Sequence, residues 1–372
     1  MGLIGCGGIG RTHAAEIERL SPLAKLTAVY DARLDCARTI ASSHAGVALA
    51  TSVDDLLSNH QLDAVVIAAP HRFHPELALE AINRGVHVFV EKPIAISATD
   101  ARVMLNAARK RPDLKFAVGL NQRSWPIWKR VHSLIASGTL GKLVRISWTI
   151  TDWYRTQAYF SASDWRGTWA GEGGGLLVNQ CPHNLDLLLW FAGAQSLVPR
   201  WVFADITLGK HHEIETEDEV HALIGFDDQL VASFIASTGE AVASNQLVIV
   251  GDRATIVVDG HRTLSIITPE VAASTHIRTS VSPKRAPDST TVTEFFDDYA
   301  DDHFDLLRAF ALSISTGTSH PLVHAEEGLA SVELANAIMV SGVSKTRVAL
   351  PLDATEFDTI LAKKIAAQAT TR

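Results

Sequence analysis

Two residues far apart in the chain, Lys92 and His183, have side chains that can handle the proton of a hydroxyl group. Lys92 lies in Glu91-Lys92-Pro93, directly after the apolar run from Val86 to Val90. An ammonium at the end of such a strand can hydrogen-bond a reacting oxygen and stabilise developing alkoxide charge. His183 is a natural proton acceptor at neutral pH. Taken singly, a Glu-Lys pair is more often a surface ion pair and a lone histidine more often structural.

The residues before His183 form a glycine-rich approach to an apolar helical pattern, Gly171-Glu172-Gly173-Gly174-Gly175. Asn179 and His183 are four residues apart, so on one helix they share a face, with Asp186 one turn beyond. Pro182 requires that this helix begins just before it or kinks there.

A second motif, Gly5-Cys6-Gly7-Gly8-Ile9-Gly10, fits the GxGxxG pattern of a dinucleotide-binding turn. Gly5 permits the tight turn, Gly7 lets the backbone approach a pyrophosphate, and Gly10 allows close packing of helix on strand. The helix that follows directs unpaired N–H groups at the phosphates. The expected turn residues are Gly5, Gly7, Gly8, Ile9 and Gly10.

An acidic residue stands where the ribose of such a dinucleotide is expected. The apolar run from Leu26 to Tyr30 ends at Asp31, 21 residues beyond Gly10. Asp31 favours NAD because a carboxylate repels the 2′-phosphate of NADP. Arg33 is either a ligand for that phosphate or an exposed loop arginine, so NADP stays possible.

The elements around these motifs divide the chain into a βαβ half and a mainly β half, which predicts an α/β fold. Short apolar runs alternate with helical patterns over residues 1–122, as in a doubly wound parallel sheet, a Rossmann domain. The first strand has only Met1 to Ile4 before the turn. The predicted strands include Leu3-Ile4, Leu26–Tyr30, Ala64–Ala69, Val86–Val90 and Phe116–Gly119, and the helices Ala14–Leu20, Pro75–Asn83 and Ala98–Arg109.

Residues 123–372 are predicted to form a second, α+β domain with a large, mainly antiparallel sheet, because strands follow one another through tight turns. The stretch Pro269 to Thr293 is predicted to be a loop, and His211-His212 a solvated loop before the acidic run Glu213 to Glu219. Pro321 separates the last two predicted helices. The predicted strands are Leu143–Ile150, Val202–Leu208, Glu219–Phe226, Leu230–Thr238, Gln246–Gly251, Ala254–Asp259, Thr263–Ile267 and Arg347–Leu352, and the helices Pro126–Ser137, Asp301–Thr316 and Ala325–Ser341.

The bulk composition narrows the class of protein. A chain of 372 residues favours two domains. A formal charge of -8 with no basic run argues against nucleic-acid and anionic-membrane partners. No run approaches the ~20 apolar residues of a membrane span. Three scattered cysteines fit a reducing cytoplasm, and no CxxC or HExxH pattern indicates a metal site.

An ordered set of motifs resembles the glucose-fructose oxidoreductase / inositol dehydrogenase / rhizopine-catabolism (GFO/IDH/MocA) family over most of the chain. The resemblance implies a Rossmann domain and a second domain with an open sheet that often forms the interface of a dimer or tetramer. The set comprises the glycine turn, Asp31, Ala69-Pro70 with His74, Glu91-Lys92-Pro93, Gly119-Leu120-Asn121-Gln122-Arg123, Gly138 with Leu140-Gly141-Lys142, and Gly173 to His183.

The family resemblance implies hydride transfer between a nicotinamide and a carbon bearing a secondary hydroxyl, on a sugar, glycoside or cyclitol. It implies that Lys92 polarises the reacting oxygen and that His183 is the base. The family's aspartate is Asn179 here, which can hold a substrate hydroxyl but cannot stabilise a charged lysine or imidazolium. The further cofactor-binding residues that it implies are Ala69, Pro70, His74, Glu91, Lys92 and Asn121.

Aromatic and basic residues after the second-domain strand Leu143–Ile150 are expected to border the substrate. Aromatic faces suit sugar rings, and arginines reach hydroxyls or an acidic group; about half of these residues are expected in the core instead. Arg123 and Trp125, just after the interdomain crossing, are weaker candidates. The segment is Asp152 to Tyr159 with Trp165, Arg166 and Trp169, in which Trp153, Arg155 and Arg166 are the preferred substrate ligands.

Two other functions remain open. An NAD-dependent glycosidase would oxidise a glycoside, eliminate the aglycone and re-reduce the sugar. A non-catalytic sensor would bind dinucleotide and a partner protein, although Lys92 and His183 argue against it.

Overall fold

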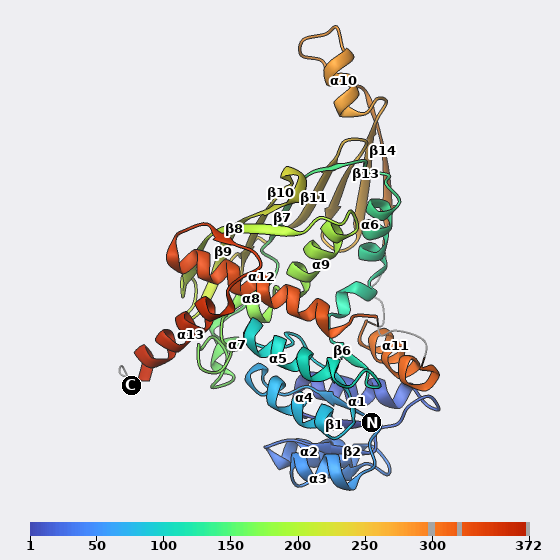
Figure 1. Cartoon of the computed structure of the whole chain (residues 1–372), viewed down its shortest axis with the longest axis vertical. Helices are drawn as coiled ribbons and strands as arrows, with labels where there is room; N and C mark the ends of the chain where they lie inside the picture. The colour runs from blue at the N-terminus through green and yellow to red at the C-terminus, as the bar shows by residue number, and fades with distance from the viewer. Residues whose placement is uncertain (297–301, 318–321, 370–372) are drawn as a thin grey trace.

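The computed structural model describes residues 1–296, 302–317 and 322–369, and these form two domains (Figure 1). Asp301 and Pro321, used above to delimit helices, lie outside the described residues. The first domain, in blue and cyan, holds a parallel sheet between helices, and the second holds a larger sheet with helices on one face (Figure 1).

The first sheet has six parallel strands in the order β3-β2-β1-β4-β5-β6, which confirms the predicted Rossmann domain. The strand order reverses between β1 and β4, and in such sheets ligands bind at this switch point. The strands are β1 (Gly2–Ile4), β2 (Ala28–Tyr30), β3 (Ala48–Leu49), β4 (Ala64–Ile67), β5 (His87–Val90) and β6 (Phe116–Val118).

Helices cover both faces of this sheet, and one of them comes from late in the chain. α11 (Asp302–Thr316) packs on α1, and its Leu307 and Phe310 are buried in the Rossmann core. The boundary expected at residue 122 therefore does not separate the two halves completely, because the chain returns to the first domain. The other helices are α1 (Gly8–Arg19), α2 (Leu34–Ser43), α3 (Val53–Asn59), α4 (His74–Asn83) and α5 (Ala98–Arg109).

The second sheet has nine strands in the order β14-β13-β12-β11-β7-β10-β9-β8-β15 and is antiparallel except between β7 and β10. This confirms the predicted α+β domain with a mainly antiparallel sheet. The strands are β7 (Leu143–Ile150), β8 (Pro199–Leu208), β9 (Glu217–Phe226), β10 (Val231–Ser237), β11 (Asn245–Gly251), β12 (Thr255–Asp259), β13 (Thr263–Pro269), β14 (Ser289–Phe295) and β15 (Val348–Ala349).

Among the described residues, helices cover one face of the large sheet: α6 (Pro126–Ala136), α9 (Pro182–Gly193) and α12 (Ala325–Ser344) (Figure 1). Trp128, Trp148 and Phe191 pack together beneath them. On the opposite face Phe203 and Leu223, which are cross-strand partners, are 46% and 44% exposed.

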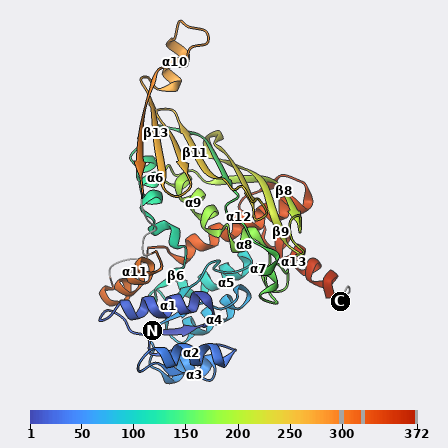
Figure 2. The same ribbon diagram turned by 180° about the vertical axis from the view of Figure 1, so that it is seen from behind.

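The prediction that Pro269 to Thr293 form a loop is wrong. This stretch contains α10 (Ala273–Thr279) and enters β14, which pairs with β13, so a long hairpin projects beyond the sheet (Figure 2). The β-branched run from Thr290 to Thr293 has the strand propensity that Ser and Pro nearby concealed. The sequence analysis also missed α13 (Ala354–Ala369), whose Phe357 is fully buried.

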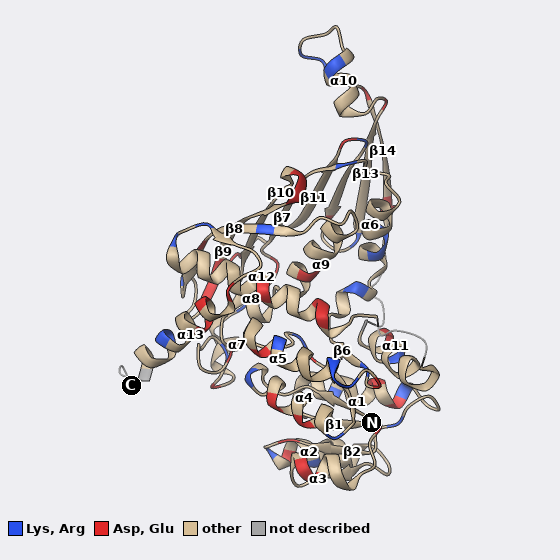
Figure 3. Ribbon diagram, in the orientation of Figure 1, with Lys and Arg blue, Asp and Glu red and all other residues tan. Residues whose placement is uncertain are grey.

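Basic and acidic residues are interspersed over both domains (Figure 3). Among the described residues, no helix is both long and apolar enough to cross a bilayer.

Candidate functional site

A cavity of about 1500 Å³ lies between the two domains and collects most of the predicted site residues. From the first domain it is lined by the glycine turn, Asp31, Lys92 and Asn121. The lining residues from the second domain include Trp153, Arg155, Arg166, Asn179 and His183.

The glycine turn has the shape that a pyrophosphate requires. Gly5 has a φ of +93°, and a Cβ on Gly10 would lie 2.0 Å from the Gly5 carbonyl oxygen, so neither position accepts a side chain. A Cβ on Gly7 or Gly8 would meet nothing within 4 Å, and both glycines line the cavity. α1 begins at Gly8 with no acidic residue in its first turn. Its N–H groups and dipole are therefore available to an anion, and the residues fit a dinucleotide.

Asp31 is held in place by two backbone donors. Its carboxylate accepts hydrogen bonds from the N–H of Cys6 at 2.7 Å and of Arg33 at 2.8 Å. Asp31 and Arg33 both line the cavity, as do Ile9, Ala69 and Pro70. A carboxylate fixed in this way is an acceptor for ribose hydroxyls.

Glu91 fixes the start of the turn that carries Lys92. One Glu91 oxygen lies 2.7 Å from His13 Nε2, and the other accepts the Lys92 N–H at 3.0 Å. Burial disfavours the Glu91 charge, but the hydrogen bond and charge of His13 outweigh it and lower the pKa of Glu91 to about 2. A Cβ on Gly119 would lie 2.8 Å from Glu91 Oε1, so only glycine leaves room for this carboxylate.

Lys92 reaches across the domain interface to the segment that carries His183. Its Nζ donates to the backbone carbonyl oxygen of Asn179 at 2.7 Å. Burial lowers the pKa of Lys92, and Arg155 adds to the effect, although Glu91 and Glu172 oppose it. Lys92 and His183 thus border one cavity, with the ammonium oriented by the second domain.

Asn179 and His183 lie on two successive helices instead of on a single one. α8 (Leu176–Asn179) ends at Asn179, and α9 begins at Pro182, where the missing N–H of proline costs no helical bond.

The Asn179 side chain is hydrogen-bonded to a buried carboxyl group, Glu172, that was not among the predicted site residues. Asn179 Nδ2 donates to the Tyr159 hydroxyl at 3.1 Å and to Glu172 Oε1. Glu172 is fully buried, and its other oxygen accepts the Gly167 N–H at 2.6 Å. Burial raises the pKa of Glu172 to about 7. An acid inside a glycine-rich segment was the only available signal.

A second buried carboxyl group, Glu217, supports the same segment. Its Oε1 accepts the N–H groups of Gly175 at 2.9 Å and Leu177 at 3.0 Å, which caps the start of α8. Burial raises the pKa of Glu217 to about 7. The solvated loop predicted here is wrong for His212, whose nearly buried ring lies 3.0 Å from Asp218.

Several predicted site residues do not line the cavity. Arg123 is 6% exposed and forms ion pairs with Asp186 and Glu327, so its expected contact with substrate is corrected to a structural role. His74 is fully buried, with its ring nitrogens 2.8 Å from the carbonyl oxygens of Pro93 and Ala69. Trp125 and Trp169 belong to the hydrophobic core.

Other lining residues were missed because they come from elements that were unassigned or remote in sequence. His71 and Gln180 flank predicted residues, His303 comes from α11, and Ile365 and Gln368 come from α13. Phe357, Ile360 and Leu361, spaced as on one helix face, were the signal for α13.

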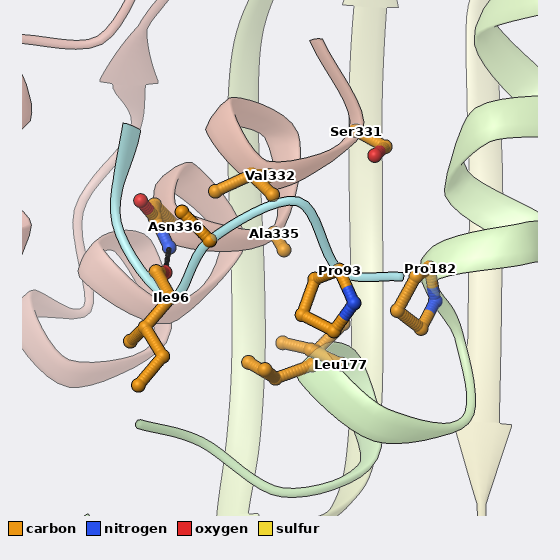
Figure 4. Close-up of a pocket in the computed structure, with 10 residues that line it drawn as sticks. Pro93, Ile96, Leu177, Pro182, Ser331, Val332, Ala335 and Asn336 are labelled. Carbon is orange, nitrogen blue, oxygen red and sulfur yellow. Dashed lines mark hydrogen bonds between the residues drawn. The ribbon is translucent and has the colours of Figure 1, made fainter. Parts of the chain in front are cut away.

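The residues that follow Lys92 and precede His183 in the chain are closely packed against each other. These residues, Pro93 and Pro182, face each other across an apolar void of about 10 Å³ beside α12 (Figure 4). The Asn336 side chain donates to the Ile96 carbonyl at 3.1 Å and accepts the Ala98 N–H at 2.9 Å. This void is too small for a substrate, so it is part of the interdomain contact.

A Rossmann domain, a carboxylate held by two backbone donors and an interdomain cavity with a lysine and a histidine define a two-domain dinucleotide-binding protein of the oxidoreductase class. Residues 1–120 match the family described as "Oxidoreductase family, NAD-binding Rossmann fold", and residues 128–257 match the "GFO/IDH/MocA C-terminal domain". The chain belongs to this NAD-binding oxidoreductase family.

Two similar proteins match this chain over 95% and 94% of its length. The WlbA dehydrogenase from Bordetella pertussis, solved with NADH and UDP-GlcNAcA, is 26% identical with a TM-score of 0.78, covering 95% of this chain and 98% of that one. Myo-inositol 2-dehydrogenase from Thermotoga maritima is 24% identical over 94% of this chain and 98% of its own. Oxidoreductase P35 from Formosa agariphila is 28% identical over 52% of this chain and 60% of its own. The chain spans only about half the length of several curated relatives it matches.

Proposed function

We propose that this protein is a dehydrogenase that transfers a hydride between NAD and a secondary hydroxyl or ketone of a sugar, glycoside or cyclitol. The observation that carries the proposal is the shared cavity of Lys92 and His183 beside the glycine turn. Relatives named inositol 2-dehydrogenase support the substrate class.

A bound nicotinamide supplies the hydride acceptor, and the side chains of this chain handle the proton. His183 takes the hydroxyl proton as base, and the Lys92 ammonium hydrogen-bonds the same oxygen as negative charge develops there. Asn179 holds a substrate hydroxyl through its amide.

Cofactor choice and assembly belong to the same proposal. Asp31 makes NAD the preferred cofactor, and Arg33 leaves NADP as the weaker one. The sheet face bearing Phe203 and Leu223 is the surface through which a homodimer or tetramer forms, because exposed apolar residues on a sheet favour association. The three free cysteines fit a cytoplasmic location.

Purified protein incubated with NAD or NADP and a panel of sugars, cyclitols and aryl glycosides tests the activity through NAD(P)H absorbance. We expect turnover of at least one polyol or sugar, with NAD preferred. Release of the aglycone without net NADH would indicate the glycosidase. Tight NADH binding with no turnover of any compound would contradict both enzyme functions and favour a sensor.

A further inference from the structure

Two arginines at the second-domain side of the cavity, Arg155 and Arg166, have no acidic partner in the part of the chain that the structure describes. Each contacts only uncharged groups: Arg155 Nη1 donates to the backbone carbonyls of Trp153 and Tyr154, and Arg166 Nη1 to the Ser163 hydroxyl. Within residues 1–296, 302–317 and 322–369, neither guanidinium forms an ion pair. The Nε atom of each is buried and finds no acceptor among the same residues.

Both guanidinium groups border one aromatic ring. The Cζ atoms of Arg155 and Arg166 lie 5.0 Å and 4.9 Å from the ring centroid of Tyr159. The Tyr159 hydroxyl accepts from the Asn179 side chain, and the Asn179 carbonyl accepts from Lys92. The two arginines therefore border the ring whose hydroxyl binds Asn179, the residue proposed to hold a substrate hydroxyl.

The positive charge at this end is only partly balanced. Burial lowers the pKa of Lys92, and the positive charge of Arg155 adds to this lowering because the two cations repel each other. Glu172 faces Lys92 and Arg166, but burial, with Glu217 adding to it, raises the pKa of Glu172 to about 7 and so weakens its charge. Asp164 and Glu215 also line the cavity, and Glu215 accepts the Trp169 N–H.

We infer that the substrate carries an anionic group, a carboxylate or a phosphate, that Arg155 and Arg166 bind close to the reacting carbon. This deepens the proposed function and rests on it for the identity of the sugar or cyclitol. Guanidinium groups suit such anions because their N–H donors pair with two oxygens at once. A neutral sugar can accept hydrogen bonds through its hydroxyl oxygens, but it supplies no negative charge to balance the two guanidinium groups.

Calorimetric binding to the enzyme–NADH complex tests the inference with matched probes: glucose, glucuronate and glucose 6-phosphate, and galactose with galacturonate. We expect at least one anion to bind ten times or more tightly than its neutral counterpart. Preference for the uronate identifies a carboxylate, and preference for the 6-phosphate identifies a phosphate. Arg155→Met and Arg166→Met should each reduce this ratio towards one, because each removes a positive charge that the anion pairs with and the neutral sugar does not. Arg109→Met, on an exposed helix end, is the control.

Equal binding of anionic and neutral probes, no binding of any anion, or a ratio that both variants leave unchanged would overturn the inference. NADH formation measured on the same probes tests the proposed function separately. Anion binding that depends on the arginines, without turnover, would support this inference and count against the dehydrogenase. Turnover of neutral sugars with no preference for anions would support the dehydrogenase and overturn this inference.

Discussion

The Asn179 side chain donates a hydrogen bond to the fully buried carboxyl group of Glu172. The resemblance implied an aspartate at residue 179, and the structure supplies a carboxyl group one hydrogen bond further from the cavity. Asn179 and Glu172 therefore form an amide–carboxyl pair, with Asn179 lining the cavity and Glu172 behind it.

Exchanging the members of this pair should preserve function better than changing either alone. In Asn179→Asp the two carboxyl groups in contact cannot both ionise, and in Glu172→Gln the charge is lost, so we expect each to lower kcat about tenfold or more. In the double variant the glutamine donates to the aspartate and accepts the Gly167 N–H, so kcat should return to within about threefold of wild type. Steady-state kinetics and a pH profile measure this. Additive losses in the double variant would show that the pair does not act as a unit.

Lys92→Met should abolish turnover without abolishing cofactor binding. Removing a group that stabilises charge at the reacting oxygen costs about 10²–10⁴-fold in kcat. Fluorescence titration should show a much smaller loss of NADH affinity than of kcat, since the glycine turn and Asp31 are untouched. Lys110→Met, on an exposed surface, serves as the control. A loss of NADH binding equal to the loss of kcat would contradict the assigned role.

Asp31→Ser should reduce discrimination between the cofactors. The carboxylate accepts two backbone N–H groups at the cavity and repels a 2′-phosphate. We expect the ratio of kcat/KM for NAD to that for NADP to fall at least about tenfold, with Asp35→Asn unchanged. An unaltered ratio would mean that Arg33 or another group sets the preference.

Glu217→Gln should gain stability relative to wild type as the pH rises. The folded-state pKa of Glu217 is raised to about 7 from an ordinary value of 4.5. The folded protein therefore binds this proton more tightly, and its contribution to stability is lost as the pH rises from about 4.5 through about 7. Glutamine keeps the Oε1 bonds to Gly175 and Leu177 and has no charge to bury.

Denaturant unfolding of both proteins at pH 5 and pH 8 measures this difference. Between pH 5 and pH 8 the free energy of unfolding of the variant should rise by about 2–3 kcal/mol relative to that of wild type. This is the part of the raised pKa of Glu217 that lies in this pH range, expressed as free energy. A difference that is the same at both values would show that Glu217 does not titrate in this window.

Phe203→Glu combined with Leu223→Glu should dissociate the proposed oligomer. These cross-strand partners stand exposed on the uncovered sheet face, where two charges oppose apolar contact. Light scattering should show a monomer with an unchanged circular dichroism spectrum. An unchanged mass would place the interface elsewhere.

The Rossmann half was predictable because its signals are local. Continuous apolar runs indicate strands buried on both faces, and glycines at fixed spacing indicate a turn whose backbone must approach a ligand. The turn from Gly5 to Gly10, Asp31 and the position of Lys92 after a strand could therefore be read from the chain.

The second half was predictable in class and less so in detail. Alternating strands predicted the antiparallel sheet, whereas α10 and β14 were missed because Ser, Thr and Pro obscured weak periodicity. The helix α13 was missed although Phe357, Ile360 and Leu361 are spaced as on one helix face. The helix α11 was predicted to belong to the second domain, but it packs in the core of the first. Nothing in its own sequence shows which core its apolar face joins.

The sequence by itself determined that Lys92 and His183 were candidates for one reaction, since residue type and element position are written in the chain. Only the tertiary structure decided which residues share the site. It placed Arg123 in a buried ion pair and His74 beneath the cavity, and it set Glu172 against Asn179. The reason is physical: burial, ion pairing and raised pKa values depend on neighbours from distant segments. The reactive residue types could be recognised from the local sequence, whereas the positions of the buried carboxyl groups and of the two cavity arginines depend on tertiary packing.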